Sequence, residues 1–246
     1  MNSVTNSERI KQATTEVLLL NPEQKQALAT IDSESTALGH VQGTTELVGV
    51  IAGIKPAALI RIEEIADPTL IEKVGLSYVL MDSDHFAVSR DMQLSLQLQD
   101  DFDNQRDLEG YLTDEGHRRI GKLLGYPETA TDYFIDRSST IHTDAELPMV
   151  LPKSLKGTTT DYFHQFILSP NNYQKEIDEH VKPLEIAVKT LTPLTYKMIE
   201  ELTNREHRME NRRKSLTKKV GAHLGNLLGI KPKEPEETDI KYLHVD

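Results

Sequence analysis

The chain has 246 residues, which suits one large domain or two small ones with a sizeable core, and its 37% apolar content excludes a wholly disordered protein. Aromatic residues make up only 5% and there is no Trp, so we expect a core of Leu, Ile, Val and Ala. The absence of Cys excludes disulfides, thiolate metal centres, iron–sulfur clusters and a cysteine nucleophile, and the net charge of −11 marks an acidic protein.

Targeting and membrane segments are not evident. The first twenty residues have neither a basic start nor a long apolar run, and the most apolar stretch, Leu47 to Ile65, is interrupted by charged residues and a proline. We therefore expect a cytoplasmic protein that does not enter a membrane.

The N-terminal part, residues 1–56, has the signals of successive helices. Asn21 is a capping side chain, and Pro22 follows it at the position where a helix tolerates proline best. We expect Gly39 and Gly43 to end that helix, and a short helix to follow and end near Gly53.

Residues 57–99 are expected to form a small antiparallel sheet. SYVLM and HFAVS lie on either side of Asp82-Ser83-Asp84 and predict a hairpin. LIRIEEI, residues 59–65, suits a strand or a helix. Met92 to Gln99 has an apolar residue at every second position, which favours a third strand, although the lack of β-branched residues leaves a helix open.

The pattern becomes helical again beyond Asp100, where Leu108, Leu112 and Ile120 trace one face, and a long helix is expected from about Leu194 to Leu228. The fold class predicted is α+β and predominantly α-helical, with a small antiparallel sheet in the N-terminal half and a long C-terminal helix. The expected order within one compact domain is a helical segment (1–56), an α+β core (57–190), the long basic helix (191–230) and a charged, partly flexible tail (231–246).

One short pattern occurs three times: GVIAGIKP from Gly49, GKLLGYP from Gly121 and GNLLGIKP from Gly225. A glycine in the left-handed conformation commonly ends a helix, an apolar residue then folds back on the last turn, and proline prevents continuation. We therefore interpret the three copies as helix ends. The alternative is a structural duplication.

The second copy continues as LLGYPETATDYF and resembles the GYP-x-Cys-Cys-x-x-x-Phe stretch of a family of uncharacterised, mainly archaeal proteins. The matching residues are Gly125, Tyr126, Pro127 and Phe134. Thr129 and Ala130 occupy the cysteine positions, so no thiol chemistry is implied. The resemblance spans about a dozen residues, implies a recurrent α-rich domain and no activity, and favours a scaffold role for this stretch.

Asp82, Asp84 and His85 follow an apolar strand and form the first candidate site. Two carboxylates and an imidazole at a strand end can hold a divalent metal such as Mg²⁺, Mn²⁺ or Zn²⁺, as a metal-dependent hydrolase or phosphotransferase requires. Further ligands would have to come from elsewhere, with His117, His142 and Asp144 as candidates. The competing interpretation is a hairpin turn, because Asp and Ser are preferred turn residues.

The second candidate site is the basic helix. Between Lys197 and Lys233 ten Lys and Arg stand against four Glu, and the residues we expect to contact a partner or nucleic acid are Arg205, Arg208, Arg212, Arg213, Lys214, Lys218 and Lys219. Apolar residues in the same segment approximate a heptad. The helix therefore packs on the acidic body, pairs with a copy of itself or another protein, or binds nucleic-acid phosphates.

The leading hypothesis from the sequence is a cytoplasmic, non-catalytic binding or interaction protein that assembles through its C-terminal helix. The two alternatives are the metal-dependent enzyme at Asp82, Asp84 and His85, and a nucleic-acid-binding protein that uses the basic helix.

Overall fold

The fold is taken from a computed structural model, which describes residues 20–108, 110–138, 158–163, 166, 168–205 and 208–209. Its elements in chain order are α2 (Pro22–Leu38), α3 (Val41–Ile51), β1 (Ala57–Arg61), η1 (Ile62–Glu64), α4 (Thr69–Lys73), β2 (Ser77–Leu80), β3 (His85–Ser89), α5 (Met92–Asn104), α6 (Asp114–Leu123), α7 (Glu128–Ser138), α8 (Thr159–Phe163), α9 (Tyr173–Glu176), η2 (Ile177–Val181) and α10 (Lys182–Leu191). Residues 193–205 are also helical. The predicted α+β, predominantly helical fold with a small antiparallel sheet is confirmed.

The sheet has the strand order β1-β3-β2, with both pairs antiparallel. Its third strand is β1, which begins before LIRIEEI and ends at Arg61, and there η1 takes over. Side chains alternate between the two faces, because successive residues of a strand point to opposite sides. Ile60 and Val88 therefore join one apolar cluster, while Ala57 and Ala87 join another.

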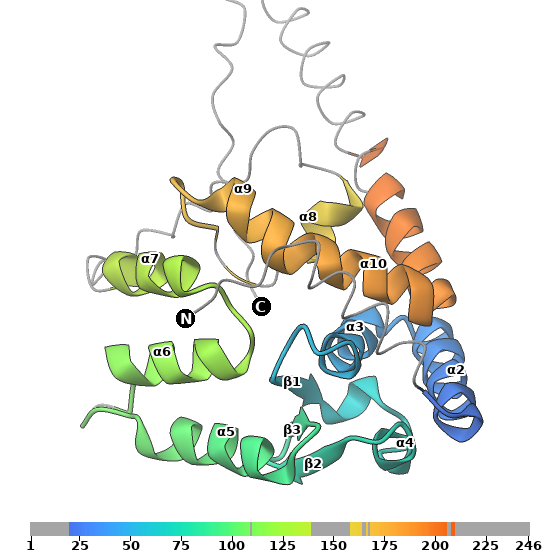
Figure 1. The fold of residues 1–246 in the computed structure, drawn as a ribbon, viewed down its shortest axis with the longest axis horizontal. Coiled ribbons are helices and arrows are strands. Elements are labelled where there is room, and N and C mark those ends of the chain that lie inside the picture. The colour runs from blue at the N-terminus through green and yellow to red at the C-terminus, as the bar shows by residue number, and fades with distance from the viewer. Residues whose placement is uncertain are drawn as a thin grey trace, which may run out of the picture.

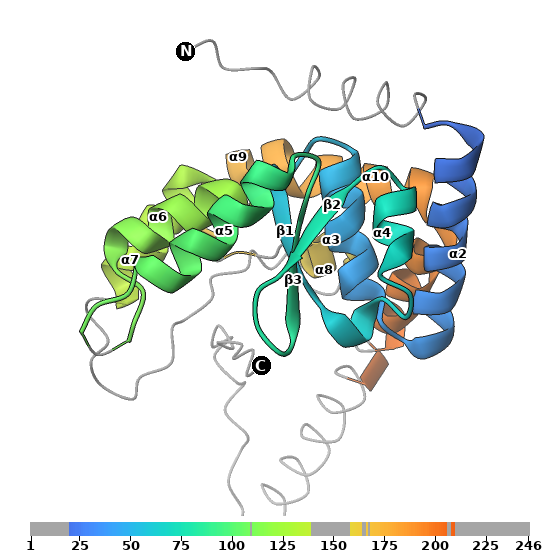
Figure 2. The same cartoon turned by 90° about the horizontal axis from the view of Figure 1, so that it is seen from below.

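Two groups of helices enclose the sheet (Figures 1 and 2). Helices α2, α3 and α4 lie on one side, with α10 packed across α3, and together they build the larger core. Helix α5 lies on the other side, with α6 packed on α5 and α7 on α6. The smaller core between α5, α6 and the sheet consists of Ala57, Ala87, Leu98, Ile120, Leu123 and Leu124.

Two of the three predicted helix ends lie within the described residues, and both have the expected geometry. Gly53 has φ +68° and Gly125 has φ +74°, values that glycine adopts without strain. After α3 the N–H of Ile54 donates to the Gly49 carbonyl at 2.9 Å, and after α6 the N–H of Tyr126 donates to the Gly121 carbonyl at 2.8 Å. These bonds satisfy the last carbonyls of each helix. The third copy, from Gly225, lies outside the described residues.

Gly43 does not end a helix, contrary to the prediction. Helix α3 begins at Val41 and includes Gly43, and α2 ends at Leu38 with Gly39 as its C-terminal cap at φ +78°. A Cβ at Gly43 would lie 2.7 Å from the Glu64 Cβ and 3.1 Å from the Ile60 Cγ2. The missing side chain therefore brings α3 close to β1 and η1.

The segment from Met92 is helix α5 and not a third strand. The Asp91 side chain caps it by accepting the Gln93 N–H. Leu98 is fully buried, whereas Met92 and Leu96 are 45% and 49% exposed. Two of the four alternating apolar residues thus lie outside the core, so the period of two does not describe a buried strand face.

Helix α6 begins later than its apolar pattern suggests. Thr113 caps it by accepting the Gly116 N–H at 3.0 Å, and the helix starts at Asp114. Leu108 and Leu112 precede it, and Leu108 is fully exposed. The predicted helical face is therefore correct only from Ile120 onward.

The helical residues 173–191 contain a wider turn, η2, in which the N–H of Lys182 donates to the Ile177 carbonyl. Pro183 follows and has no N–H to donate, which fits a local change of helical pitch.

The helix at residues 193–205 is held by a residue from the other end of the chain. Asp32 is only 3% exposed, and its carboxylate accepts the N–H groups of Leu194 at 3.1 Å and Thr195 at 2.7 Å. These amides belong to the first turn, where a helix has no internal acceptor for them. The expected helix from about Leu194 is confirmed over residues 193–205, and its continuation to Leu228 lies outside the described residues apart from residues 208–209.

Candidate functional site

A polar pocket of about 200 Å³ opens beside the end of β1 where Arg61 pairs with His85 of β3. Its lining comes from α3, β1, η1, β3 and the corner after α6, and consists of Gln42, Glu46, Leu59, Arg61, Glu64, His85, Leu124 and Tyr126. We call this set the polar pocket. Acidic, basic and phenolic groups from elements far apart in the sequence thus meet in one place.

Glu46, in the wall of the polar pocket, forms a buried ion pair with Lys55. The Lys55 Nζ lies 2.6 Å from the Glu46 Oε2, and the two side chains are 6% and 8% exposed. Lys55 comes two residues after Gly53, so the turn that ends α3 directs it back along that helix. Bringing two charges out of water is costly unless they are paired at close range, as they are here.

Two glycines make room for the stem of Lys55. A Cβ at Gly49 would lie 2.9 Å from the Lys55 Cδ, and a Cβ at Gly125 would lie 3.2 Å from both the Lys55 Cα and Cγ. The first and second copies of the repeated glycine pattern therefore meet around one lysine. Their shared role is close packing as well as helix termination.

Tyr126 belongs to the same arrangement. Its ring lies under Lys55, with the Nζ 5.7 Å from the ring centroid. Burial raises the pKa of the Tyr126 hydroxyl well above its usual range, and the negative charge of Glu46 adds to that rise. The phenol therefore keeps its proton, and the residue that the sequence suggested as scaffold also lines the polar pocket.

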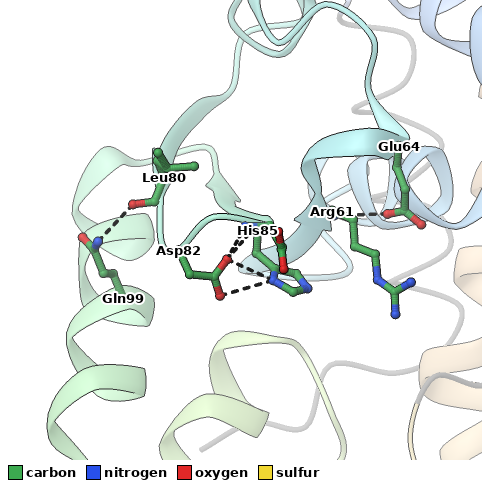
Figure 3. A network of polar contacts seen from close by, with 7 residues as sticks. Arg61, Glu64, Leu80, Asp82, His85 and Gln99 are labelled. Carbon is green, nitrogen blue, oxygen red and sulfur yellow. Dashed lines mark hydrogen bonds and ion pairs between the residues drawn. The ribbon is translucent and has the colours of Figure 1, made fainter. Parts of the chain in front are cut away.

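Glu64 and Arg61 also line the polar pocket and lie near His85 (Figure 3). The Glu64 Oε2 accepts the backbone N–H of Arg61 at 3.2 Å. Burial raises the pKa of Glu64 above its ordinary value, against the smaller lowering effect of that hydrogen bond and of the Arg61 charge. The Arg61 guanidinium makes no hydrogen bond or ion pair with any residue that the structure describes, and it points away from the Glu64 carboxylate.

The predicted metal-binding residues lie at the hairpin between β2 and β3. The Asp82 Oδ1 accepts the N–H groups of Asp84 at 2.7 Å and His85 at 2.8 Å, and the His85 Nδ1 lies 3.2 Å from the same oxygen. These bonds hold the pKa of Asp82 below its usual range, with the Asp84 amide as the largest cause. The hydrogen bonds are those of a side-chain-stabilised turn.

The metal hypothesis stays a prediction. In the described part of the chain no three His, Asp or Glu side chains gather where they could hold a metal ion. His117 lies on α6 with its ring 5.0 Å from that of Phe134, and burial lowers its pKa. The other two suggested ligands, His142 and Asp144, lie outside the described residues.

The basic-helix hypothesis also stays a prediction. Arg205 and Arg208 are exposed, and the Arg208 Nε donates to the Asn204 carbonyl at 3.1 Å. The remaining residues of that proposed contact set, Arg212, Arg213, Lys214, Lys218 and Lys219, lie outside the described residues.

The sequence did not indicate Glu46, Lys55, Arg61 or Glu64. The available signal was the Gly49-to-Pro56 pattern, which places a lysine at a tight helix end, but nothing in that pattern identifies its partner.

No protein-family model matches this chain, and no curated protein or solved structure matches it. Within the described residues, no helix is both long enough and apolar enough to span a bilayer.

Proposed function

We propose that this protein is a binding protein that holds a small charged molecule in the polar pocket. The observation that carries the proposal is the gathering of Glu46, Arg61, Glu64 and His85 around one cavity, from α3, β1, η1 and β3. Convergent polar and charged groups in a concave site are typical of ligand recognition.

Fold stability alone is a weak reason for such an arrangement. A buried ion pair contributes little net stability compared with apolar residues of the same volume, because the desolvation of both charges offsets their attraction. The Glu46–Lys55 pair nonetheless lies against a cavity, next to an arginine whose guanidinium has no ion-pair partner among the described residues. Binding of a charged ligand explains both features.

The test is a ligand-detected NMR screen of small amino acids, amines, carboxylates and phosphates against the wild-type protein and Gln42→Trp. Gln42 is exposed at the pocket, so an indole there should fill it without changing any charge. We expect at least one compound class to bind the wild type and not the variant. Gln26→Trp, on an exposed site of α2, is the matched control. Absence of binding, or equal binding to Gln42→Trp, would refute the proposal.

A second candidate function is self-association through the C-terminal helix. The specific support is that Asp32 fixes the start of the helix at 193–205 while Arg205, Arg208 and Met209 are exposed further along. In Figure 1 the end of this helix extends beyond the body formed by α2 and α10. An apolar side chain among arginines on a protruding helix suits a helical partner.

Light scattering after gel filtration tests the self-association. We expect the wild type to be an oligomer and Met209→Asp to shift toward the monomer. Ile186→Asp, which replaces an exposed apolar residue on α10, should leave the oligomer intact. A monomeric wild type would rule out self-association.

A further inference from the structure

The positions of the charges in the polar pocket define the chemistry of its ligand. We propose that the polar pocket takes a small zwitterion, a free amino acid with one carboxylate and one ammonium group. This inference rests on the proposed binding function and specifies its ligand class.

The carboxylate end of the ligand is assigned to Arg61 and His85. The two residues face each other across β1 and β3, and directly opposed residues of an antiparallel pair lie side by side on the same face. Both side chains extend to the same side of the strands in Figure 3. A guanidinium presents a planar fork of donors that matches a carboxylate, and that of Arg61 makes no ion pair with a described residue.

The His85 ring contributes to the same end. Its Nδ1 lies 3.2 Å from the Asp82 Oδ1, so the turn fixes the orientation of the ring. The second ring nitrogen remains for a ligand, on the side of Arg61 in Figure 3. The hairpin that the sequence suggested as a metal site thus acts, in this proposal, as the support of a binding residue.

The ammonium end is assigned to Glu64, because the neighbouring Glu46 is already paired with Lys55. Both carboxylates line the pocket, and Glu64 is close enough to Glu46 for the Glu46 charge to contribute to the raised pKa of Glu64. A positive group placed between them would relieve that repulsion, because an opposite charge stabilises an ionised carboxylate. The Tyr126 hydroxyl retains its proton and adds a donor or acceptor nearby.

The balance of charges favours a zwitterion over an anion. The positive charges of Lys55 and Arg61 equal in number the negative charges of Glu46 and Glu64, so the formal charges in and beside the pocket nearly cancel. A phosphate, which carries up to two negative charges and no positive group, would occupy Arg61 and leave the Glu64 carboxylate without a positive partner. Complementary charge patterns of this kind determine specificity.

The volume limits the ligand to a small amino acid. A pocket of about 200 Å³ is smaller than the roughly 300–1,000 Å³ typical of sites for drug-sized ligands, which favours a small ligand. Leu59 and Leu124 provide an apolar wall for a short side chain. Alanine and serine are small amino acids that suit such a pocket.

The experiment compares L-alanine with probes that lack one of its two charges. Titrations followed by protein NMR would use L-alanine, alaninamide, propionate and inorganic phosphate. We expect saturable binding of L-alanine, with shifts centred on Arg61 and Glu64. The other three probes should bind at least about tenfold more weakly, because each loses a charge-assisted contact or meets the Glu64 carboxylate without compensation.

Two variants locate the binding. Arg61→Gln and Glu64→Gln should each weaken L-alanine binding by about tenfold or more, since each removes one charged contact. Arg118→Gln, which alters an exposed arginine paired with Asp132 outside the pocket, is the control and should bind like the wild type.

The outcomes separate the two proposals. Tighter binding of propionate or phosphate than of L-alanine, abolished by Arg61→Gln, would overturn the zwitterion and leave the binding function intact. Equal binding of L-alanine to all variants would place the ligand elsewhere and overturn the inference. Absence of binding by every probe here and by every class in the wider screen would overturn both.

Discussion

Replacing Lys55 by Met tests whether the ion pair in the pocket wall is as deeply buried as the structure shows. Methionine keeps most of the stem that packs against Gly49 and Gly125, but it leaves the Glu46 carboxylate buried without its partner at 2.6 Å. Removing one partner of a buried pair costs about 3–5 kcal/mol. For a chain of this length each kcal/mol lowers Tm by about 2–4 °C, so we expect a decrease of roughly 6–20 °C in thermal unfolding followed by circular dichroism.

Two further variants make that result specific. Adding Glu46→Gln to Lys55→Met should restore part of the lost stability, because the unpaired buried charge is removed. Lys182→Met breaks an ion pair with Asp178 in which the side chains are 48% and 36% exposed, and should cost less than about 1 kcal/mol. If Lys55→Met is no more damaging than Lys182→Met, the Glu46–Lys55 pair is not desolvated and the described pocket wall is wrong.

Three other substitutions test neighbouring features. Gly125→Ala should cost about 1–2 kcal/mol in urea unfolding, because φ is +74° there, and a cost near zero would contradict that backbone conformation. The folded-state pKa of Glu64 is raised, so ionisation of this residue lowers the free energy of unfolding as pH rises through that pKa. Glu64→Gln should therefore stabilise the fold more at neutral than at acidic pH. A difference in unfolding free energy that does not depend on pH would refute the raised pKa. Asp82→Ala should lose about 1 kcal/mol through its turn hydrogen bonds, whereas Asp82→Asn keeps an acceptor and most of the stability; metal-dependent stabilisation of the wild type alone would instead favour the metal site.

The parts of the fold that the sequence predicts are those decided by a few neighbouring residues. The Asn21 cap, the left-handed Gly53 and Gly125, and the turn at Asp82 each depend on hydrogen bonds within about five residues. The incorrect predictions are those for which contacts between distant parts of the chain determine the local structure. Gly43 lies inside α3 because the helix must approach Glu64 closely, and this requirement cannot be seen from the local sequence.

The candidate site was not predictable for the same reason. Glu46 and Lys55 lie on either side of a helix end whose geometry must be known before their contact can be inferred. Tyr126 reaches them only because α6 ends against the same turn. The stretch LLGYPETATDYF was interpreted as scaffold, because nothing within it indicates the lysine that lies over the Tyr126 ring.

The cap that Asp32 provides has a consequence for the order of folding. Its two acceptor bonds go to residues 162 and 163 positions further along the chain. During synthesis, α2 emerges long before these partners exist, so a carboxylate destined for the interior must remain hydrated until residue 195 is available. Contacts of such large sequence separation form late, because the intervening chain must first lose its conformational freedom. Any chain that stops short of Leu194 therefore lacks the two amides that satisfy Asp32, and the Asp32 carboxylate of such a chain has to stay in contact with water.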